Sequence, residues 1–234
     1  MSTLRRRRER LAVGLAFLFV ACSGNMSPPP PFPVAGGPRV VRQGDAQVAL
    51  AAGGGEAWNW SGLATFARYR RGLGHRVDLG GDVMSVLHDD NGIRGTMLGK
   101  IGSRIGLAQG VAVEAGVGGS TGWRRSFSQD IALSLGLNDT TTRWEFFGTA
   151  RLAHSHGYRA SDCCDSDTIA PPNTLFTLAS IGTSYAFQPS PGTNSRTRLF
   201  AETGLGQVSP RGQPTGHTFY VGIGVILDFS RTQR

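Results

Sequence analysis

The sequence predicts an all-β fold: a closed antiparallel β-barrel of about ten strands, with eight strands as the alternative. Three observations lead to this prediction. Apolar and polar residues alternate with a period of two through ten segments between residues 45 and 229. Glycine is abundant at 34 of 234 residues, lysine is almost absent, and no helix-period apolar stripe follows the N-terminus. Within the ten segments, charged residues share a strand face with glycine and serine, which leaves the other face apolar.

Residues 1–21 are expected to be a signal peptide, because an arginine cluster precedes the apolar run 11–20 and the small residue Ala21. The run is about half the length that a membrane-spanning helix needs. The formal charge is +8, and the N-terminal cluster supplies about half of it. The remaining charge is that of an ordinary solvated protein, so no nucleic-acid partner is expected.

Residues 19–22, read as FVAC, resemble the lipobox of bacterial lipoproteins. The resemblance implies cleavage before Cys22 and lipidation of that cysteine. Residues 22–44 are rich in proline, glycine and serine without periodicity, so they are expected to form an extended linker. The barrel is then expected at 45–229, with a C-terminal tail at 230–234.

The last segment, residues 216–229, shows the alternation most clearly. One face is wholly apolar and begins and ends with Phe219 and Phe229, which lie roughly 33 Å apart along a strand, or about 25 Å in height at a 40° tilt. This height matches the apolar band of a membrane barrel. The segment resembles the C-terminal strand of bacterial outer-membrane β-barrel proteins, and this resemblance implies that the barrel-assembly machinery and outer-membrane lipid are partners.

A charge that faces hydrocarbon costs roughly 2 to 4 kcal/mol near the bilayer midplane, so the charged face must line the lumen. The two signs are nearly balanced, which predicts a mostly occluded lumen filled by ion pairs. The expected lumen charges are Arg68, Asp78, Asp82, Arg94, Lys100, Glu114, Asp130, Arg143, Glu145, Arg151, Arg198 and Glu202. The expected aromatic residues at the membrane interfaces are Tyr69, Phe127, Trp144, Tyr185, Phe187, Phe219 and Phe229.

The stretches HRVDLG, EAGVGG and YVGIGVILDF resemble those of small bacterial outer-membrane β-barrel families. Membership would imply the fold and the outer-membrane location, without implying a particular activity. Short and long connections alternate along the chain, and an even strand number leaves both termini in the periplasm.

The loop at 154–167 holds the main cluster of reactive side chains: two histidines, the adjacent Cys163 and Cys164, and three aspartates. Their spacing matches no known zinc module, and a bond between adjacent cysteines would be strained. An exposed polar loop is therefore expected, and neither a metal site nor a cofactor is predicted. Asp78 and Asp82 share a strand face, but ion pairing is a better role for them than acid–base catalysis.

The stretch RLAHSHGY also resembles the histidine-x-serine motif of lipid A deacylases, with His156 at the serine position. Because histidine stands at the serine position, the expected nucleophile is missing. The sequence favours a non-catalytic outer-membrane barrel that has a structural role or binds a ligand through its external loops, and the identity of that ligand stays open. A lipid A-modifying enzyme that uses His154 or His156 is one alternative. A soluble ligand carrier of the calycin type is the other, because its strands alternate in the same way with the faces exchanged.

Overall fold

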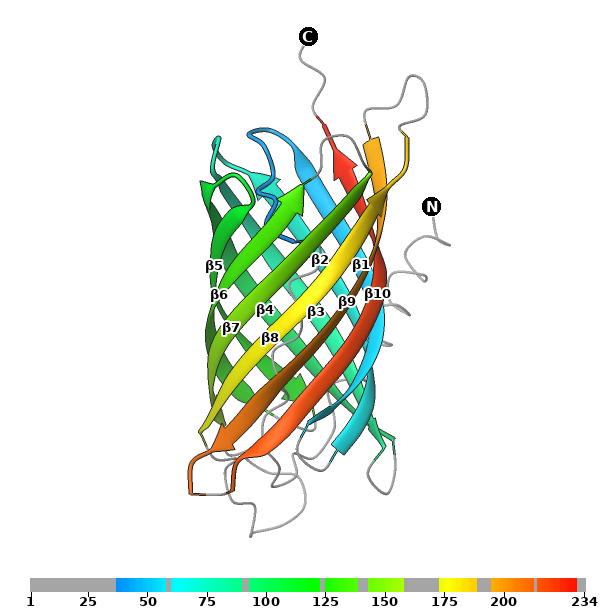
Figure 1. The fold of residues 1–234 in the computed structure, drawn as a ribbon. Coiled ribbons are helices and arrows are strands. Elements are labelled where there is room, and N and C mark those ends of the chain that lie inside the picture. Colours follow the sequence, from blue (N-terminus) through cyan, green and yellow to red (C-terminus); the bar gives the residue numbers. More distant parts are fainter. Residues whose placement is uncertain are drawn as a thin grey trace, which may run out of the picture.

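The computed structural model describes residues 37–57, 60–89, 93–122, 125–138, 143–157, 173–188, 195–212 and 214–230. Ten strands follow one another along the chain (Figure 1). They are β1 (Ala46–Ala57), β2 (Trp60–Gly72), β3 (Val77–Asp89), β4 (Ile93–Ala108), β5 (Val111–Gly122), β6 (Ser126–Asn138), β7 (Trp144–Gly157), β8 (Thr174–Ala186), β9 (Ser195–Pro210) and β10 (Gly216–Phe229). Among the described residues, no helix is long and apolar enough to cross a membrane.

The ten strands form one closed antiparallel barrel in which each strand pairs with its neighbours in sequence. The ring closes where β1 pairs with β10, in a register that joins Ala46 to Phe229 and Ala57 to Thr218. The predicted fold class is therefore confirmed, with ten strands and not eight. The weak first segment belongs to the sheet, and β10 has the bounds that the alternation predicts. Because β1 begins where β10 ends, we call this end the mouth and the opposite end the loop end (Figure 1).

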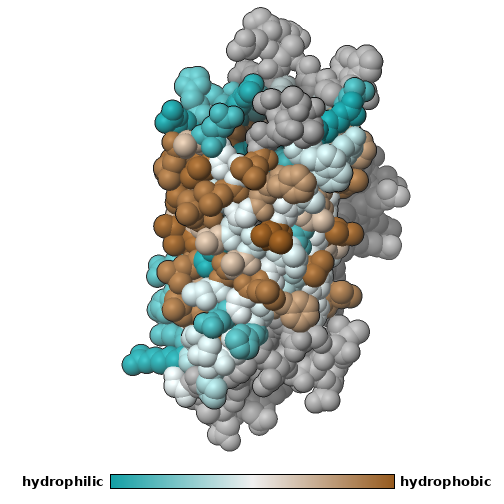
Figure 2. Space-filling model, in the orientation of Figure 1, coloured by the Kyte–Doolittle hydropathy of each residue, from teal (hydrophilic) through white to brown (hydrophobic). Residues whose placement is uncertain are grey.

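The two faces of the barrel wall differ sharply in character. On β10, the outward side chains of Phe219, Val221 and Ile223 are 44%, 52% and 64% exposed, whereas the inward side chains of Tyr220 and Ile226 are buried. Figure 2 shows apolar residues gathered in a band over the middle of the barrel, with hydrophilic residues towards both ends. The strands thus place a nearly continuous apolar surface outside and most of their charges inside.

Aromatic side chains lie on the outer face near both ends of the barrel. At the mouth, the rings of Trp144 and Tyr185 lie 5.0 Å apart and those of Tyr185 and Phe187 5.4 Å apart, measured between centroids. Tyr69 and Phe229 are exposed on the same end, while Phe127 and Phe219 are exposed near the loop end. The residues expected at two membrane interfaces therefore occupy two levels that are separated by aliphatic side chains.

Inside the barrel, three aromatic rings lie over glycines of the neighbouring strand. The ring of Phe147 covers Gly182, that of Tyr220 covers Gly204, and that of Phe200 covers Gly224, each so closely that a Cβ on the glycine would collide with the ring. Glycine on the inner face therefore makes room for large side chains in a narrow lumen.

Residues 37–45 differ from the extended linker expected over 22–44. This stretch, which we call the inserted segment, turns back from the start of β1 into the mouth, and Gly37, Pro38 and Val41 are buried there. It forms a parallel bridge between Gln43 and Gly72 at the end of β2. Composition alone favours an extended chain here, but the barrel interior offers buried partners that a free linker lacks. The rest of the expected linker, residues 22–36, lies outside the described residues.

Candidate functional site

The largest ion-pair network in the described part of the lumen is built around the carboxylate of Glu114 on β5, which is 1% exposed. Its Oε1 lies 2.8 Å from Lys100 Nζ, and its Oε2 lies 2.8 Å from Arg70 Nη2 and 3.0 Å from Arg104 Nη2. The guanidinium of Arg68 lies 3.6 Å from Oε1. Four cations from β2 and β4 therefore surround one buried anion, and Arg151 Nη2 of β7 lies 4.0 Å from its Oε1.

A second carboxylate, Asp82 on β3, holds Arg68 in a two-point contact with distances of 2.8 and 2.7 Å. Asp130 on β6 continues the network across the barrel, at 3.2 Å from Lys100 Nζ and 3.4 Å from Arg151 Nη1. Paired, two-point contacts of this kind offset part of the cost of removing charges from water. The network therefore links β2 to β7 through the middle of the lumen.

A separate cluster lies near the mouth, between β7, β9 and β10. Arg198 donates to both carboxylate oxygens of Asp228, at 2.8 and 3.1 Å, and its Nη1 lies 3.3 Å from Glu145 Oε2. Gln47 Nε2 donates to Asp228 Oδ1 at 2.8 Å, which ties this cluster to β1. Polar side chains therefore bridge the strand pair that closes the ring.

Glu202 on β9 has a different environment from the other lumen carboxylates. Its Oε1 accepts hydrogen bonds from Ser180 Oγ at 2.7 Å and Tyr220 Oη at 3.0 Å. Its Oε2 has no hydrogen-bond partner among the described residues. The hydrogen-bond donors to the Glu202 carboxylate are thus neutral hydroxyl groups.

Most of the expected lumen charges are inside the barrel, and two are not placed there. The side chain of Arg143 is exposed, because the residue precedes β7 and lies at the rim. The side chain of Arg94 lies outside the described residues, although its backbone pairs with His88. Sequence reasoning left out several lumen residues that share strand parity with the expected ones or belong to the inserted segment, namely Arg39, Gln47, Arg70, Arg104 and Asp228.

Residues of three strands hold the inserted segment. Arg104 Nη1 donates to the carbonyl oxygens of Gly37 and Arg39 at 3.0 and 2.9 Å, and the amide of Val41 donates to Asp78 Oδ2 at 2.9 Å. The backbone of Gly72 exchanges hydrogen bonds with that of the segment: Gly44 donates to Gly72, and Gly72 donates to Asp45. Charged side chains of the lumen, Asp78 and Arg104, thus hold the inserted segment in addition to pairing with other charges.

The segment also reaches the opposite wall of the mouth. Arg39 Nε lies 3.0 Å from Glu145 Oε2, and a Cβ on Gly37 would lie 3.1 Å from the ring of Phe147. Burial lowers the pKa of the Arg39 guanidinium, while the neighbouring Glu145 carboxylate acts in the opposite direction. The segment therefore crosses the mouth from β2 and β3 to β7.

On the loop-end side of the Glu114 network lies a cavity of about 60 Å³. Its lining combines Asp82, Lys100, Asp130 and Arg151 with apolar and small side chains, including Phe176. This volume has room for a few water molecules at most.

His154 and His156 lie on the outer face of β7 near the loop end, and their ring centroids are 4.2 Å apart. Ser155, between them, points inward and is buried. The expected loop cluster with Cys163 and Cys164 lies outside the described residues. Within the described part of the chain, no group of three or more histidine, cysteine, aspartate or glutamate side chains could hold a metal ion.

No protein-family model matches the sequence, and no curated protein matches it either. Among solved structures, the chain is similar to the β-domain of the Bordetella autotransporter BrkA, with a TM-score of 0.46 and 10% identity over 80% of this chain and 99% of that one. It is also similar to a bacterial polysaccharide outer-membrane secretin, with a TM-score of 0.40 and 9% identity over 82% and 100% of the two chains. The N-terminal β-barrel domain of Pseudomonas aeruginosa OprF has a TM-score of 0.38 and 11% identity over 80% and 98%.

Proposed function

We propose that this protein resides in the bacterial outer membrane, which it crosses with its ten strands, with the mouth facing the periplasm. The observation that carries the proposal is the distribution of side chains: an exposed apolar band between two aromatic levels surrounds a charged interior. Leu63, Ile181 and Leu205 are 70%, 69% and 69% exposed on the outer face. Water disfavours such a surface, whereas lipid acyl chains favour it.

The same distribution argues against the soluble carrier. A soluble barrel that binds apolar ligands needs a polar outer face and an apolar cavity, and its charges would face solvent. Here Arg68, Arg104 and Glu114 are almost fully buried inside, and the outer face carries the aliphatic residues.

We further propose that the lumen is mostly occluded and that the protein works without catalysis, as a structural element of the membrane or through ligands of its external loops. The carboxylate of Glu114 and the cations around it lie buried inside the lumen, and the inserted segment lies across the mouth. In this proposal Cys22 is acylated after cleavage of the signal peptide.

Membrane fractionation combined with heat-modifiable gel mobility tests the location. An outer-membrane barrel stays with the membrane and migrates faster before boiling than after it. A chain that remains soluble without detergent would refute membrane residence. Planar bilayer recording tests the occlusion: the purified barrel should give no steady conductance, and a stable open level would contradict it.

A lipid-modifying enzyme is the second candidate, because two imidazoles in contact lie on the outer face, where an outer-leaflet lipid would be within reach. The test is replacement of both His154 and His156 by asparagine, followed by mass spectrometry of lipid A. If lipid A is the same in cells that lack the protein, cells that make the natural protein and cells that make the variant, the non-catalytic proposal is supported. A modification that requires the histidines supports the enzyme.

A further inference from the structure

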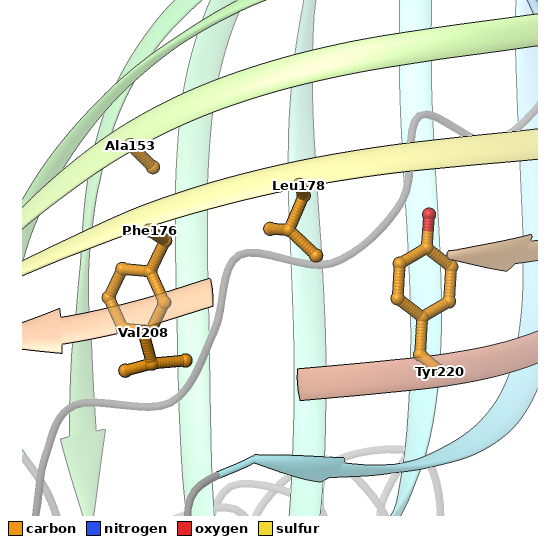
Figure 3. Packing of buried hydrophobic residues seen from close by; sticks show 5 residues of the cluster. All are labelled: Ala153, Phe176, Leu178, Val208 and Tyr220. Carbon is orange, nitrogen blue, oxygen red and sulfur yellow. The ribbon is translucent and has the colours of Figure 1, made fainter. Parts of the chain in front are cut away.

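The two ends of the barrel differ in charge. Near the loop end, the inner face of β7 to β10 carries an uncharged cluster whose side chains pack together (Figure 3), namely Ala153, Phe176, Leu178, Val208 and Tyr220. The described chain has five exposed arginine side chains, and four of them lie at the mouth: Arg42, Arg71, Arg76 and Arg143. The fifth, Arg211, lies at the loop end in the turn between β9 and β10. No described aspartate or glutamate side chain is exposed to the same degree, so the exposed charge of the described residues is positive and gathers at the mouth.

The turn between β2 and β3 brings two of these arginines together. Arg71 is the last residue but one of β2, and Arg76 directly precedes β3. The amide of Leu73 donates to the carbonyl oxygen of Val77 at 2.9 Å, which closes the turn. His75, in the same turn, is also exposed. Two guanidinium groups and one imidazole are therefore carried by a single tight turn.

The inserted segment adds a third arginine at this point. The carbonyl oxygen of Arg42 lies so close to Gly72 that a Cβ on the glycine would collide with it. Two carboxylates are near: Asp78 is buried and pairs with Arg70 at 2.7 Å, and Asp45 is half-buried. We call the exposed set of Arg42, Arg71, His75 and Arg76 the basic corner. With the histidine neutral, three cations stand here against one partly exposed carboxylate.

The basic corner lies at the depth of lipid head groups if the barrel spans a membrane. Arg71 pairs with Leu79, which is 45% exposed on the outer face, and it follows the exposed Tyr69 of the aromatic level by two residues. Two residues of a strand span about 6.6 Å, or about 5 Å in height at a 40° tilt. The head-group region is about 5 to 8 Å deep on each side of the hydrocarbon. Arg71 is therefore level with phosphate groups.

The chemistry of the basic corner suits a phosphate. A guanidinium offers a planar set of donors that matches the oxygens of a phosphate group, and several cations near an anionic lipid surface add to one another. On the outer face, the exposed apolar residues Leu73 and Leu79 stand beside the arginines. This mixture fits the boundary between acyl chains and phosphates better than it fits an acidic protein in water.

We propose that the basic corner binds the phosphate of an anionic glycerophospholipid in the periplasmic leaflet. The inference rests on the proposed location of the barrel in the outer membrane and adds a lipid class and the residues that recognise it. Because Arg42 belongs to the inserted segment, that segment contributes to the lipid contact in addition to lying across the mouth.

A lipid titration followed by native mass spectrometry tests the proposal on the purified protein in a non-ionic detergent. The probes are phosphatidylglycerol and phosphatidylcholine with the same acyl chains, which differ in net charge. The natural barrel should retain phosphatidylglycerol preferentially. Replacement of Arg42, Arg71 and Arg76 by glutamine should lower the apparent affinity for phosphatidylglycerol at least about tenfold, because each arginine near an anionic surface contributes about fivefold. Retention of phosphatidylcholine should not change.

Two matched variants separate charge and position from a general effect on the barrel. Replacement of the same three arginines by lysine keeps the charge, so this variant should keep the preference for phosphatidylglycerol. Arg211→Gln removes an exposed arginine at the opposite end and should bind like the natural protein. Heat-modifiable gel mobility shows that each variant is folded. If the triple glutamine variant does not fold, Arg71→Gln alone should weaken the binding of phosphatidylglycerol about fivefold.

Equal retention of the two lipids by the natural protein would overturn the inference, as would unchanged binding in the folded glutamine variants. Either result leaves the membrane location standing, since fractionation tests it separately. An equal loss in Arg211→Gln would also overturn the inference, because the position of the charge would then be irrelevant. Binding of polyglutamate that requires the three arginines, without a preference for phosphatidylglycerol, would assign the basic corner to an acidic protein instead.

Discussion

At the scale of single residues, the lumen depends most on Glu114. It is the one described carboxylate that approaches Arg68, Arg70, Lys100 and Arg104 together. The arginines are almost fully buried, so loss of this anion would leave several cations close together in a medium that solvates them poorly.

Replacement of Glu114 by glutamine should therefore destabilise the folded barrel by about 3 to 5 kcal/mol, the range typical of breaking a buried ion pair. The shape of the side chain is kept, so packing changes little. The measurement is the urea midpoint of the purified protein in detergent, and the loss of the fast-migrating form on a gel reports unfolding.

Asp130→Asn is the matched control. Asp130 contacts two cations, Lys100 and Arg151, at 3.2 and 3.4 Å. Glu114 has more cationic partners, three of them within 3.0 Å, so a smaller loss is expected for Asp130→Asn. Equal losses in the two variants would show that Glu114 has no special role.

At the scale of elements, the inserted segment depends on close approach to the end of β2. A Cβ on Gly72 would collide with the carbonyl oxygens of both Arg42 and Val41. Only glycine leaves room for the backbone hydrogen bonds that hold Gly44 and Asp45 at this point.

Gly72→Ala should displace the inserted segment while the barrel stays closed, since strand pairing does not involve residues 37–45. The bond after Arg39 should then become several-fold more sensitive to trypsin in the native protein. The rate is followed by mass spectrometry of the released peptide.

Gly74→Ala provides the control from the same turn, because a Cβ there would meet no atom within 4 Å. Its cleavage rate should match that of the unchanged protein. If trypsin cleaves the Gly72→Ala variant at this rate too, the close approach of Gly72 to Arg42 does not hold the segment.

At the scale of the whole molecule, the strand pattern was predictable because the outer face and the lumen require different residues at alternate positions. The outer face requires apolar residues at alternate positions, as in Phe219, Val221 and Ile223, and the lumen requires small or paired polar ones between them. The fold class and the bounds of β10 follow from this constraint alone.

The site was less predictable, because its contacts join residues far apart in sequence. Val41 donates to Asp78 across 37 positions, which composition cannot reveal. Arg104 was overlooked, although it lies on β4, which continues to Ala108. For Arg143 the parity rule was applied one residue beyond the strand, where the side chain is free to turn outward.

The outer surface gives the last prediction, which separates a bilayer from water as the surroundings of the barrel. Ile223 is 64% exposed near the middle of β10 and points away from the lumen. If lipid surrounds it, Ile223→Arg should cost about 2 to 4 kcal/mol of folding free energy in vesicles. Leu73→Arg, an exposed position in the turn after β2, should cost little, because that turn lies outside the apolar band. Urea unfolding in lipid vesicles measures both. Were the barrel surrounded by water, Ile223→Arg would be as mild as Leu73→Arg, since an exposed arginine on a solvated strand is readily tolerated.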